Sequence, residues 1–310
     1  MKTLSSIRRV NRRRYDTYRF LIVLTFLATT AIAQSRPAPP DRARTTVSDI
    51  TREELVSFER SRVIAQADRF LNETPITVTA VTAPRSAGGA HDFFSEGDYW
   101  WPDPSDPSKP YVRRDGETNP DNFEVHRSAM RRLSVMVPAL TAAFEITGNA
   151  RYARHAVTHL RAWFVAESTR MNPNLMYAQA IKGVATGRGI GIIDTIHLVE
   201  VAQAALELER LGAFSGPELA GTKEWFREYT QWMTTSKFGL DERNNGNNHS
   251  AAWALQVAAF SRFTATRCAW LRCASSSPVR SFRSRWHRTA ASPRSWPGRN
   301  RTGIRSSSWT

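Results

Sequence analysis

Apolar residues recur every three or four positions through most of the chain between residues 51 and 264. This spacing gives a helix one apolar stripe that can face a core. No stretch shows a comparable alternation of the strand type. The ranges with the helical pattern are 51–72, 123–147, 150–167, 192–211, 217–236 and 250–263. The pattern therefore predicts an all-α fold.

Short connections join several of these ranges. Gly148-Asn149 is a turn between two predicted helices, Pro138 predicts a kink in the first of them, and Thr51-Arg-Glu-Glu54 is a capping box. Residues 75–90 are β-prone and then glycine-rich. Successive antiparallel helix pairs with functional loops between them indicate a helical bundle or an α/α toroid of helical hairpins.

Residues 91–120 interrupt the helical pattern with many prolines, which exclude a regular helix. A loop of this length in a compact domain is usually functional or disordered, and its aromatic residues argue against disorder. Tyr99, Trp100 and Trp101 have two interpretations. They stack on sugar rings as part of a lid, or they pin the loop to the core.

A second unusual stretch, residues 244–249, is Asn-Asn-Gly-Asn-Asn-His. Asparagine favours turns and caps, so the stretch predicts a loop leading into a helix, with His249 in the first turn. Amide donors such as Asn248 beside an imidazole are a plausible reaction centre. The alternative is an ordinary asparagine-rich turn with a capping role.

The formal net charge of +15 is concentrated at the two ends. Taking the +6 of residues 1–20 and the +10 of residues 265–310 from this total leaves −1 for residues 21–264. A nucleic-acid interface needs basic residues clustered on the folded part. We therefore predict no nucleic-acid partner.

The N-terminus predicts an exported protein. A basic stretch precedes an apolar run ending in Ala31-Ile-Ala33, which fits a signal peptide over residues 1–33. The apolar run is short for a membrane span, so we expect no stable membrane insertion after cleavage. The expected location is the periplasm or the medium. The alternative is an uncleaved membrane anchor. Residues 34–50 are a proline-rich flexible leader.

Four motifs, taken in order, resemble the alginate lyase family of polysaccharide lyases. They are residues 95–104 (Ser-Glu-Gly-Asp-Tyr-Trp-Trp-Pro-Asp-Pro), 177–181 (Tyr-Ala-Gln-Ala-Ile), 187–194 (Gly-Arg-Gly-Ile-Gly-Ile-Ile-Asp) and the stretch containing Asn248 and His249. The resemblance covers about residues 55–264. It implies an α/α toroid, incomplete in this chain over residues 51–264, whose cleft binds an acidic polysaccharide that is cleaved by β-elimination.

Elimination next to a uronate carboxylate requires that carboxylate to be neutralised, a base for the C5 proton, and an acid for the departing oxygen. Asn248 fits the first role, with Arg188 a weaker candidate, and His249 fits the base. Arg188 lies between glycines that permit either close approach to a ligand or a tight turn. Gln179 is expected to direct its amide into the cleft.

His126 and Arg127 begin a helix after the long loop, where they contact a substrate carboxylate or form part of a solvated helix face. His155, His159 and His197 lack carboxylate or cysteine partners at ligand spacing, so we predict no metal site and no cofactor. The only two cysteines, Cys268 and Cys273, receive no role.

Composition changes abruptly at residue 265, where arginine, serine and tryptophan replace the helical pattern. We interpret residues 265–310 as a frame-shifted segment; a basic disordered extension is the alternative. The resembled family uses a tyrosine after the Asn-His pair, whereas this chain has none after Tyr229. This departure supports a second hypothesis, a catalytically inactive carbohydrate-binding or decayed relative. A glycoside hydrolase is a third, with Asp98, Asp103 and Asp194 as available carboxylates.

Overall fold

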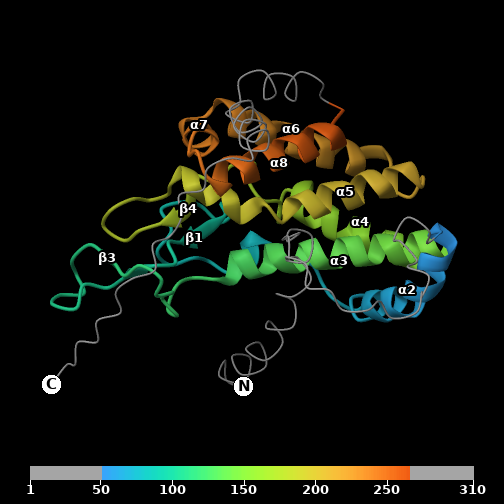
Figure 1. Cartoon of the computed structure of the whole chain (residues 1–310), viewed down its shortest axis with the longest axis horizontal. Helices are drawn as coiled ribbons and strands as arrows, with labels where there is room; N and C mark the ends of the chain where they lie inside the picture. The colour runs from blue at the N-terminus through green and yellow to red at the C-terminus, as the bar shows by residue number, and fades with distance from the viewer. Residues whose placement is uncertain (1–50, 266–310) are drawn as a thin grey trace, which may run out of the picture. The chain divides into compact units, whose positions relative to one another are not determined.

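The computed structural model describes residues 51–265, and helices dominate this part of the chain (Figure 1). The predicted signal peptide, the leader, both cysteines and all but the first residue of the predicted tail lie outside the described residues. The helices are α2 (Arg52–Asp68), α3 (Val125–Thr147), α4 (Ala150–Phe164), α5 (Leu198–Arg210), α6 (Gly216–Thr235), α7 (Lys237–Arg243) and α8 (Asn248–Phe263). The all-α prediction is confirmed.

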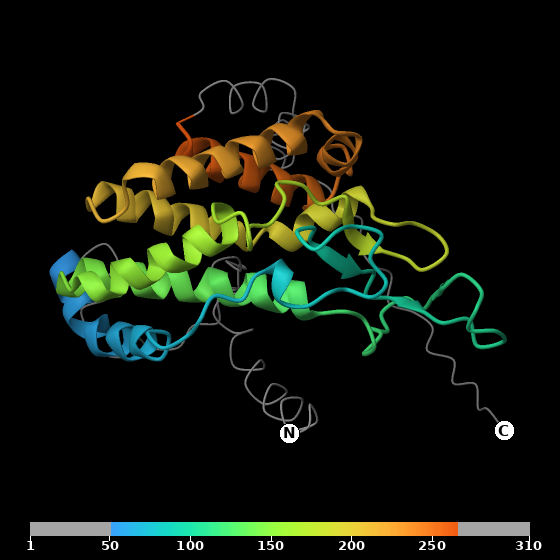
Figure 2. The same ribbon diagram turned by 180° about the vertical axis from the view of Figure 1, so that it is seen from behind.

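The long helices pack as antiparallel neighbours in layers (Figures 1 and 2). Helix α3 contacts α2, α4 and α5, while α8 contacts α5, α6 and α7. The stripe predicted on α3 is buried at Met130, Leu133, Val137 and Leu140. Tight connections keep neighbouring helices antiparallel: Gly148 ends α3 with a φ of 67°, which only glycine adopts freely.

Aromatic side chains fill the core between α4, α6 and α8. The ring of Phe164 lies 4.7 Å from that of Trp225 and 5.1 Å from that of Phe226, and the Phe226 ring lies 5.0 Å from that of Phe260. These tilted contacts are the arrangement that aromatic pairs prefer. The helices that carry the functional loops therefore rest on a rigid base.

Four short strands correct the expectation of no β-structure. Strand β1 (Phe94–Glu96) pairs in parallel with β4 (Tyr177–Ala180), and β2 (Trp100–Trp101) pairs antiparallel with β3 (Val112–Arg113). Strands of two to four residues are too short to show a periodic pattern, which is why the sequence did not reveal them. The pairing brings two of the four motifs together, although they lie about 80 residues apart in the sequence.

Two further differences concern residues near the site. The range 192–211 begins as a 3₁₀ helix, η3 (Gly189–Thr195), before α5, and the β-prone stretch contains η2 (Val78–Ala80). A Cβ on Gly191 would lie 2.5 Å from the Cβ of Ala178, so glycine lets η3 press against β4. Helix α7 was not predicted, because seven residues give too little periodicity.

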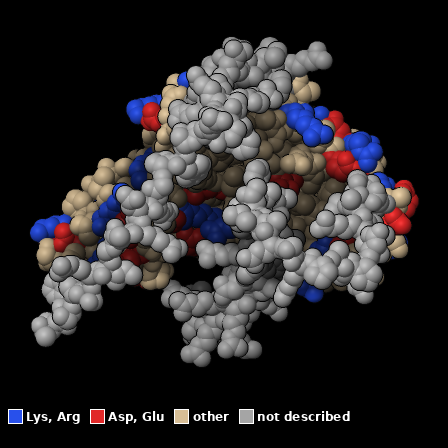
Figure 3. All heavy atoms as spheres, viewed as in Figure 1, with Lys and Arg blue, Asp and Glu red and all other residues tan. Residues whose placement is uncertain are grey.

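No single helix of residues 51–265 is both long and apolar enough to cross a membrane; η3 and α5, bent by 45°, meet the criteria only as a pair. On the face seen in Figure 3, basic and acidic side chains lie next to one another.

Candidate functional site

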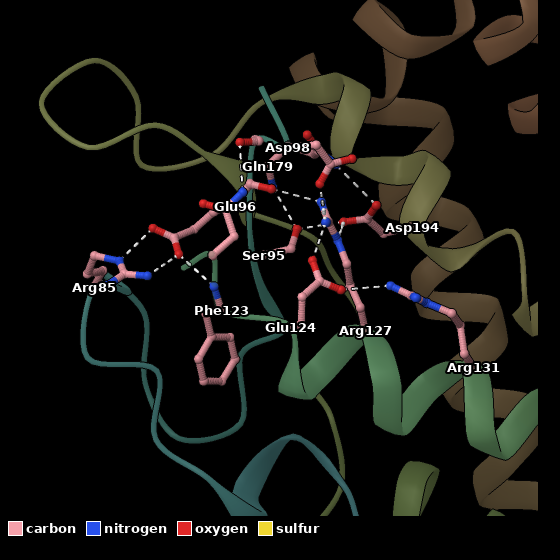
Figure 4. A network of polar contacts seen from close by, with 12 residues as sticks. Arg85, Ser95, Glu96, Asp98, Phe123, Glu124, Arg127, Arg131, Gln179 and Asp194 are labelled. Carbon is pink, nitrogen blue, oxygen red and sulfur yellow. Dashed lines mark hydrogen bonds and ion pairs between the residues drawn. The ribbon is translucent and has the colours of Figure 1, made fainter. Parts of the chain in front are cut away.

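A network of buried polar groups joins β1, β4, α3 and η3, and its centre is Asp194 (Figure 4). One oxygen of Asp194 accepts hydrogen bonds from Ser95 Oγ at 2.5 Å and from Arg127 Nε at 3.1 Å. The other oxygen accepts from Gln179 Nε2 at 3.3 Å. The Asp194 side chain is only 8% exposed. One carboxylate thus fixes three segments that are distant in the sequence.

Gln179 connects this network to Arg188. Its backbone has a φ of 55°, an unfavourable region for a residue with a side chain. Its N–H donates to Ser95 Oγ at 2.8 Å, while its carbonyl accepts from Arg188 Nε at 2.7 Å. Local strain of this kind costs about 1–3 kcal/mol and is concentrated at functional sites. The strained turn directs the backbone carbonyl and the side chain of Gln179 toward the same guanidinium.

Arg188 forms no ion pair with any carboxylate in the described part of the chain. Within residues 51–265, its guanidinium donates hydrogen bonds to both oxygens of Gln179 and packs against Gly97. Burial lowers its pKa below the ordinary value, with the charge of Arg113 acting in the same direction and those of Asp98 and Asp194 opposing. A partly buried cation without an ion-pair partner is suited to bind an anionic ligand.

A second group of side chains lies on α7 and α8. His249 Nδ1 is 2.7 Å from Glu242 Oε1, and the Glu242 side chain is fully buried whereas that of His249 is 22% exposed. Asn245 Nδ2 donates to the other Glu242 oxygen at 3.4 Å. Burial raises the pKa of Glu242, and the hydrogen bond from His249 opposes this.

The asparagine-rich stretch performs different tasks at each position. Asn247 caps α8 by accepting from the His249 N–H at 2.9 Å, as the capping interpretation predicted. Asn245 holds Glu242, while Asn244 accepts from Arg243. Only Asn248 remains: it is exposed, and its amide has no hydrogen-bond partner among the described residues. The stretch therefore caps α8 and also carries one exposed amide on the residue that precedes His249 in the sequence.

The two groups adjoin each other through η3 and α7. A Cβ on Gly189 would lie 2.8 Å from the carbonyl oxygen of Phe238 in α7, so the two elements are in direct contact. The charge of Asp194 also raises the pKa of Glu242. The element that follows Arg188 thus packs on the helix that carries Glu242, the partner of His249.

The aromatic residues of the long loop differ in accessibility. Tyr99 is 40% exposed. Trp101 is held within the loop, because its indole N–H donates to the Glu117 carbonyl at 2.8 Å and the Arg114 guanidinium lies 4.9 Å from its ring centre. Trp100 packs against Gly97, beside Arg188. Trp101 therefore ties parts of the loop to one another, and neither of these contacts pins it to the core; Tyr99 and Trp100 remain candidates for sugar contact.

His126 and Arg127 require a correction, because neither lies on a solvated face nor offers a free group to substrate. His126 is 2% exposed, and its ring nitrogens contact the Phe94 N–H at 3.0 Å and the Val81 carbonyl at 3.1 Å. Burial lowers its pKa. Arg127 is 6% exposed and is occupied by carboxylates. Both are structural residues under the site.

The carboxylates considered for hydrolysis do not form a catalytic pair. Asp98 and Asp194 both bind Arg127. Asp103 is bonded to Ser105, whose side-chain and backbone hydrogen bonds lower its pKa. A general acid needs a raised pKa, so the arrangement does not favour glycoside hydrolysis.

A cavity borders residues of β1 and β4. The cavity has a volume of about 340 Å³ and is lined by Phe94, Glu96 and Ala180, among others, whose positions on β1 and β4 alternate with those of Ser95 and Gln179. Within residues 51–265, no group of three histidine, cysteine or carboxylate side chains could hold a metal ion.

Sequence reasoning missed Glu242 and Ser95. Glu242 lies between Asp241 and Arg243, and nothing in the local sequence distinguishes it from its charged neighbours. Glu242 and His249 lie on different helices, so no helical spacing in the sequence indicates their contact.

Comparisons with known proteins identify the family and the fold. The sequence profile described as alginate lyase matches residues 77–278, about two thirds of the chain. The fold is similar to that of an alginate lyase from Bacteroides ovatus known from its crystal structure, with a TM-score of 0.65 and 35% sequence identity. The match covers 70% of this chain and 58% of that one, so the chain spans less than two thirds of that protein's length. Among curated proteins, no sequence matches the chain. The described helices are therefore those of the α/α-toroid type of fold, and the chain belongs to the alginate lyase family.

Proposed function

We propose that this protein is a polysaccharide lyase that cleaves a uronic-acid polymer by β-elimination. One observation carries the proposal. A partly exposed imidazole, His249, is held on one side by a fully buried carboxylate, and a free amide, that of Asn248, lies next to it in the sequence. An oriented base beside an unoccupied donor is the pair of groups that abstraction of a proton next to a carboxylate needs.

The residues divide the chemistry between them. Asn248 and Arg188 donate to the uronate carboxylate, which spreads the negative charge that develops when C5 loses its proton. His249 Nε2 takes that proton. The C5–H electron pair forms the C4=C5 double bond, and the C4–O4 bond breaks.

The departing O4 oxygen needs one proton to become a hydroxyl group. The imidazolium formed on His249 holds the proton taken from C5, and C4 and C5 are neighbouring atoms. Return of this proton to O4 balances the reaction and restores the neutral base, with no other reactant. His249 therefore serves as base and then as acid in this proposal.

The substrate class follows from charge. Arg188 has no ion-pair partner among the described carboxylates, whereas Arg127 is occupied by three. A guanidinium that lacks an ion-pair partner and lies next to Trp100 suits a sugar that carries a carboxylate, with the ring packed on the indole. An acidic polysaccharide of the alginate type meets both requirements.

Product chemistry tests the proposal. With polyuronate as substrate, a lyase produces an unsaturated sugar with new ultraviolet absorbance, whereas a hydrolase produces reducing ends alone. We expect His249→Ala to abolish the absorbance gain while retaining polymer binding. His91→Ala is a matched control, since His91 bonds to the Arg170 carbonyl outside the site. Turnover retained in His249→Ala would remove His249 from the mechanism.

A non-catalytic carbohydrate-binding protein is the second candidate. Tyr229, the last tyrosine of the sequence, is fully buried and bonds to Thr195 Oγ1 at 2.6 Å. Because the Tyr229 side chain is completely buried, its hydroxyl group is not accessible to a substrate oxygen. Polymer binding without either absorbance or reducing ends would favour this candidate. We also propose export to the periplasm or medium, on the basis of the signal-peptide pattern in residues 1–33.

A further inference from the structure

Glu242 is a buried carboxylate that the proposed reaction does not use directly. It lies in α7, and its side chain is fully buried. Within residues 51–265, no lysine or arginine forms an ion pair with it, and its side-chain partners are His249 and Asn245. Burying a carboxylate without a cation costs several kcal/mol. Such a cost is usually retained where the charge serves a site.

The geometry of this carboxylate relative to the imidazole is specific. Glu242 Oε1 is 2.7 Å from His249 Nδ1, a distance typical of a charge-assisted hydrogen bond. The residues are seven apart and occupy different helices, so the contact depends on the turn between α7 and α8. Two bonds hold this turn: Gly246 N–H donates to Ser250 Oγ at 2.8 Å, and Ser250 Oγ donates to the Glu242 carbonyl at 3.4 Å.

We propose that Glu242 is the positioning residue for His249: its carboxylate accepts the Nδ1–H proton, so that the lone pair of Nε2 is presented to the substrate. A neutral imidazole carries its proton on one nitrogen only, and the partner of the other nitrogen decides which one. With Nδ1–H held by Glu242, Nε2 must be the base. The same carboxylate then stabilises the imidazolium that proton abstraction creates.

The groups around Glu242 act on its ionisation in opposite directions. The charged and titratable groups around it are His249 on α8, Asp194 on η3 and Tyr229 on α6. Burial and the charge of Asp194 raise the pKa of Glu242, while the hydrogen bonds from His249 and Asn245 lower it. His249 and Asn245 are thus the groups that favour the charged form. This inference rests on the proposed role of His249 as base.

Two substitutions separate charge from hydrogen bonding. Glu242→Met removes the acceptor at similar volume. Glu242→Gln keeps an oxygen acceptor and removes the charge. Glu209→Gln is the matched control, because Glu209 binds Lys223 on α6 and lies outside the site. Circular dichroism and urea unfolding show which variants fold.

The first measurement is independent of catalysis. Long-range ¹H–¹⁵N correlation of the full chain labelled at histidine reports which ring nitrogen carries the proton, and His249→Ala identifies the relevant signals among the seven histidines. We expect the Nδ1–H form in the unaltered protein and in Glu242→Gln, and the Nε2–H form in Glu242→Met. An Nε2–H form in the unaltered protein would overturn the proposal, as would an unchanged Nδ1–H form in Glu242→Met.

The second measurement is turnover on polyuronate. We expect kcat to fall by about 10- to 1000-fold in Glu242→Met and by a smaller factor in Glu242→Gln, with KM nearly unchanged, since Glu242 acts on the base and not on the substrate. Unchanged kcat in a folded Glu242→Met variant would overturn the positioning role. Failure of the proposed function is distinguishable, because an inactive unaltered protein would still show the tautomer that Glu242 selects.

Discussion

Arg127 is the most heavily bonded side chain of the network around Asp194, and Arg127→Met tests how that network is stabilised. The guanidinium donates to Asp194 at 3.1 Å, Asp98 at 2.5 Å, Glu124 at 2.7 Å and the Glu96 carbonyl at 2.9 Å. Burial acts to lower its pKa, but the three carboxylates raise the pKa above the ordinary value. Arg127 is therefore permanently charged, and its removal leaves Asp98 and Asp194 without an ion-pair partner among the described residues, whereas Glu124 keeps Arg131.

The cost can be divided among the partners. Asp98 and Glu124 are 42% and 44% exposed, so water replaces the cation and each loss costs about 0–1 kcal/mol. Asp194 is 8% exposed, and an uncompensated buried charge costs about 3–5 kcal/mol. Ser95 and Gln179 still donate to Asp194, which places the expected total near the lower end, at about 3 kcal/mol.

Urea unfolding measures this loss of free energy. For a slope of about 3 kcal/mol/M, the midpoint should fall by about 1 M. The double variant Arg127→Met/Asp194→Asn removes the uncompensated charge, so we expect it to recover most of the lost stability. A double variant no more stable than Arg127→Met would show that the cost does not come from Asp194, and this would refute the reasoning.

Two further predictions concern pH and packing. Burial and the charges of His155 and Arg132 lower the pKa of His159 to about 4. The unfolded chain therefore binds a proton near pH 6.5 that the folded protein binds only near pH 4, and the free energy of unfolding should fall by up to about 3 kcal/mol as the pH drops between these values. Urea titrations at both pH values should show a smaller pH dependence for His159→Gln than for the unaltered protein. An unchanged dependence would contradict this. Gly191→Ala should destabilise the protein by about 2–3 kcal/mol, because the added Cβ would lie 2.5 Å from the Cβ of Ala178. In the control Gly89→Ala, the nearest contact of the added Cβ would be 3.8 Å, so the stability should change little. If thermal melts show equal losses of stability for the two variants, the packing argument is wrong.

The helices were predictable because their apolar stripes are long. On α3, Met130, Leu133, Val137 and Leu140 repeat over three turns and all are buried. The strands were not predictable, since β2 contains only Trp100 and Trp101 and two residues carry no period. Helix α7 was also not predicted, because its seven residues are too few to show a helical period. Local pattern therefore located the supports of the site but not the short elements that bring its parts together.

The site itself was only partly predictable. His249 and Asn248 stood out because four asparagines in six residues are unusual, and Arg188 stood out between glycines. His126 and Arg127 were wrongly expected to be accessible, because a polar pair at a helix start is usually solvated. Their burial depends on contacts with β1 and η3 that only the folded chain creates. Glu242 was overlooked although it is buried, since nothing in the local sequence distinguishes a buried glutamate from an exposed one.

Asp194 connects the two halves of the site more directly than the sequence suggests. Its carboxylate fixes Gln179, whose two oxygens hold the Arg188 guanidinium. Its own element, η3, packs on α7, where Glu242 holds His249. The candidate carboxylate-binding group and the candidate base therefore share one support. Because a displacement of about 1 Å between reacting groups can cost about 100-fold in rate, loosening this support should lower turnover even where the protein remains folded. A stable Arg127→Met/Asp194→Asn variant with impaired turnover would be the signature of that shared role.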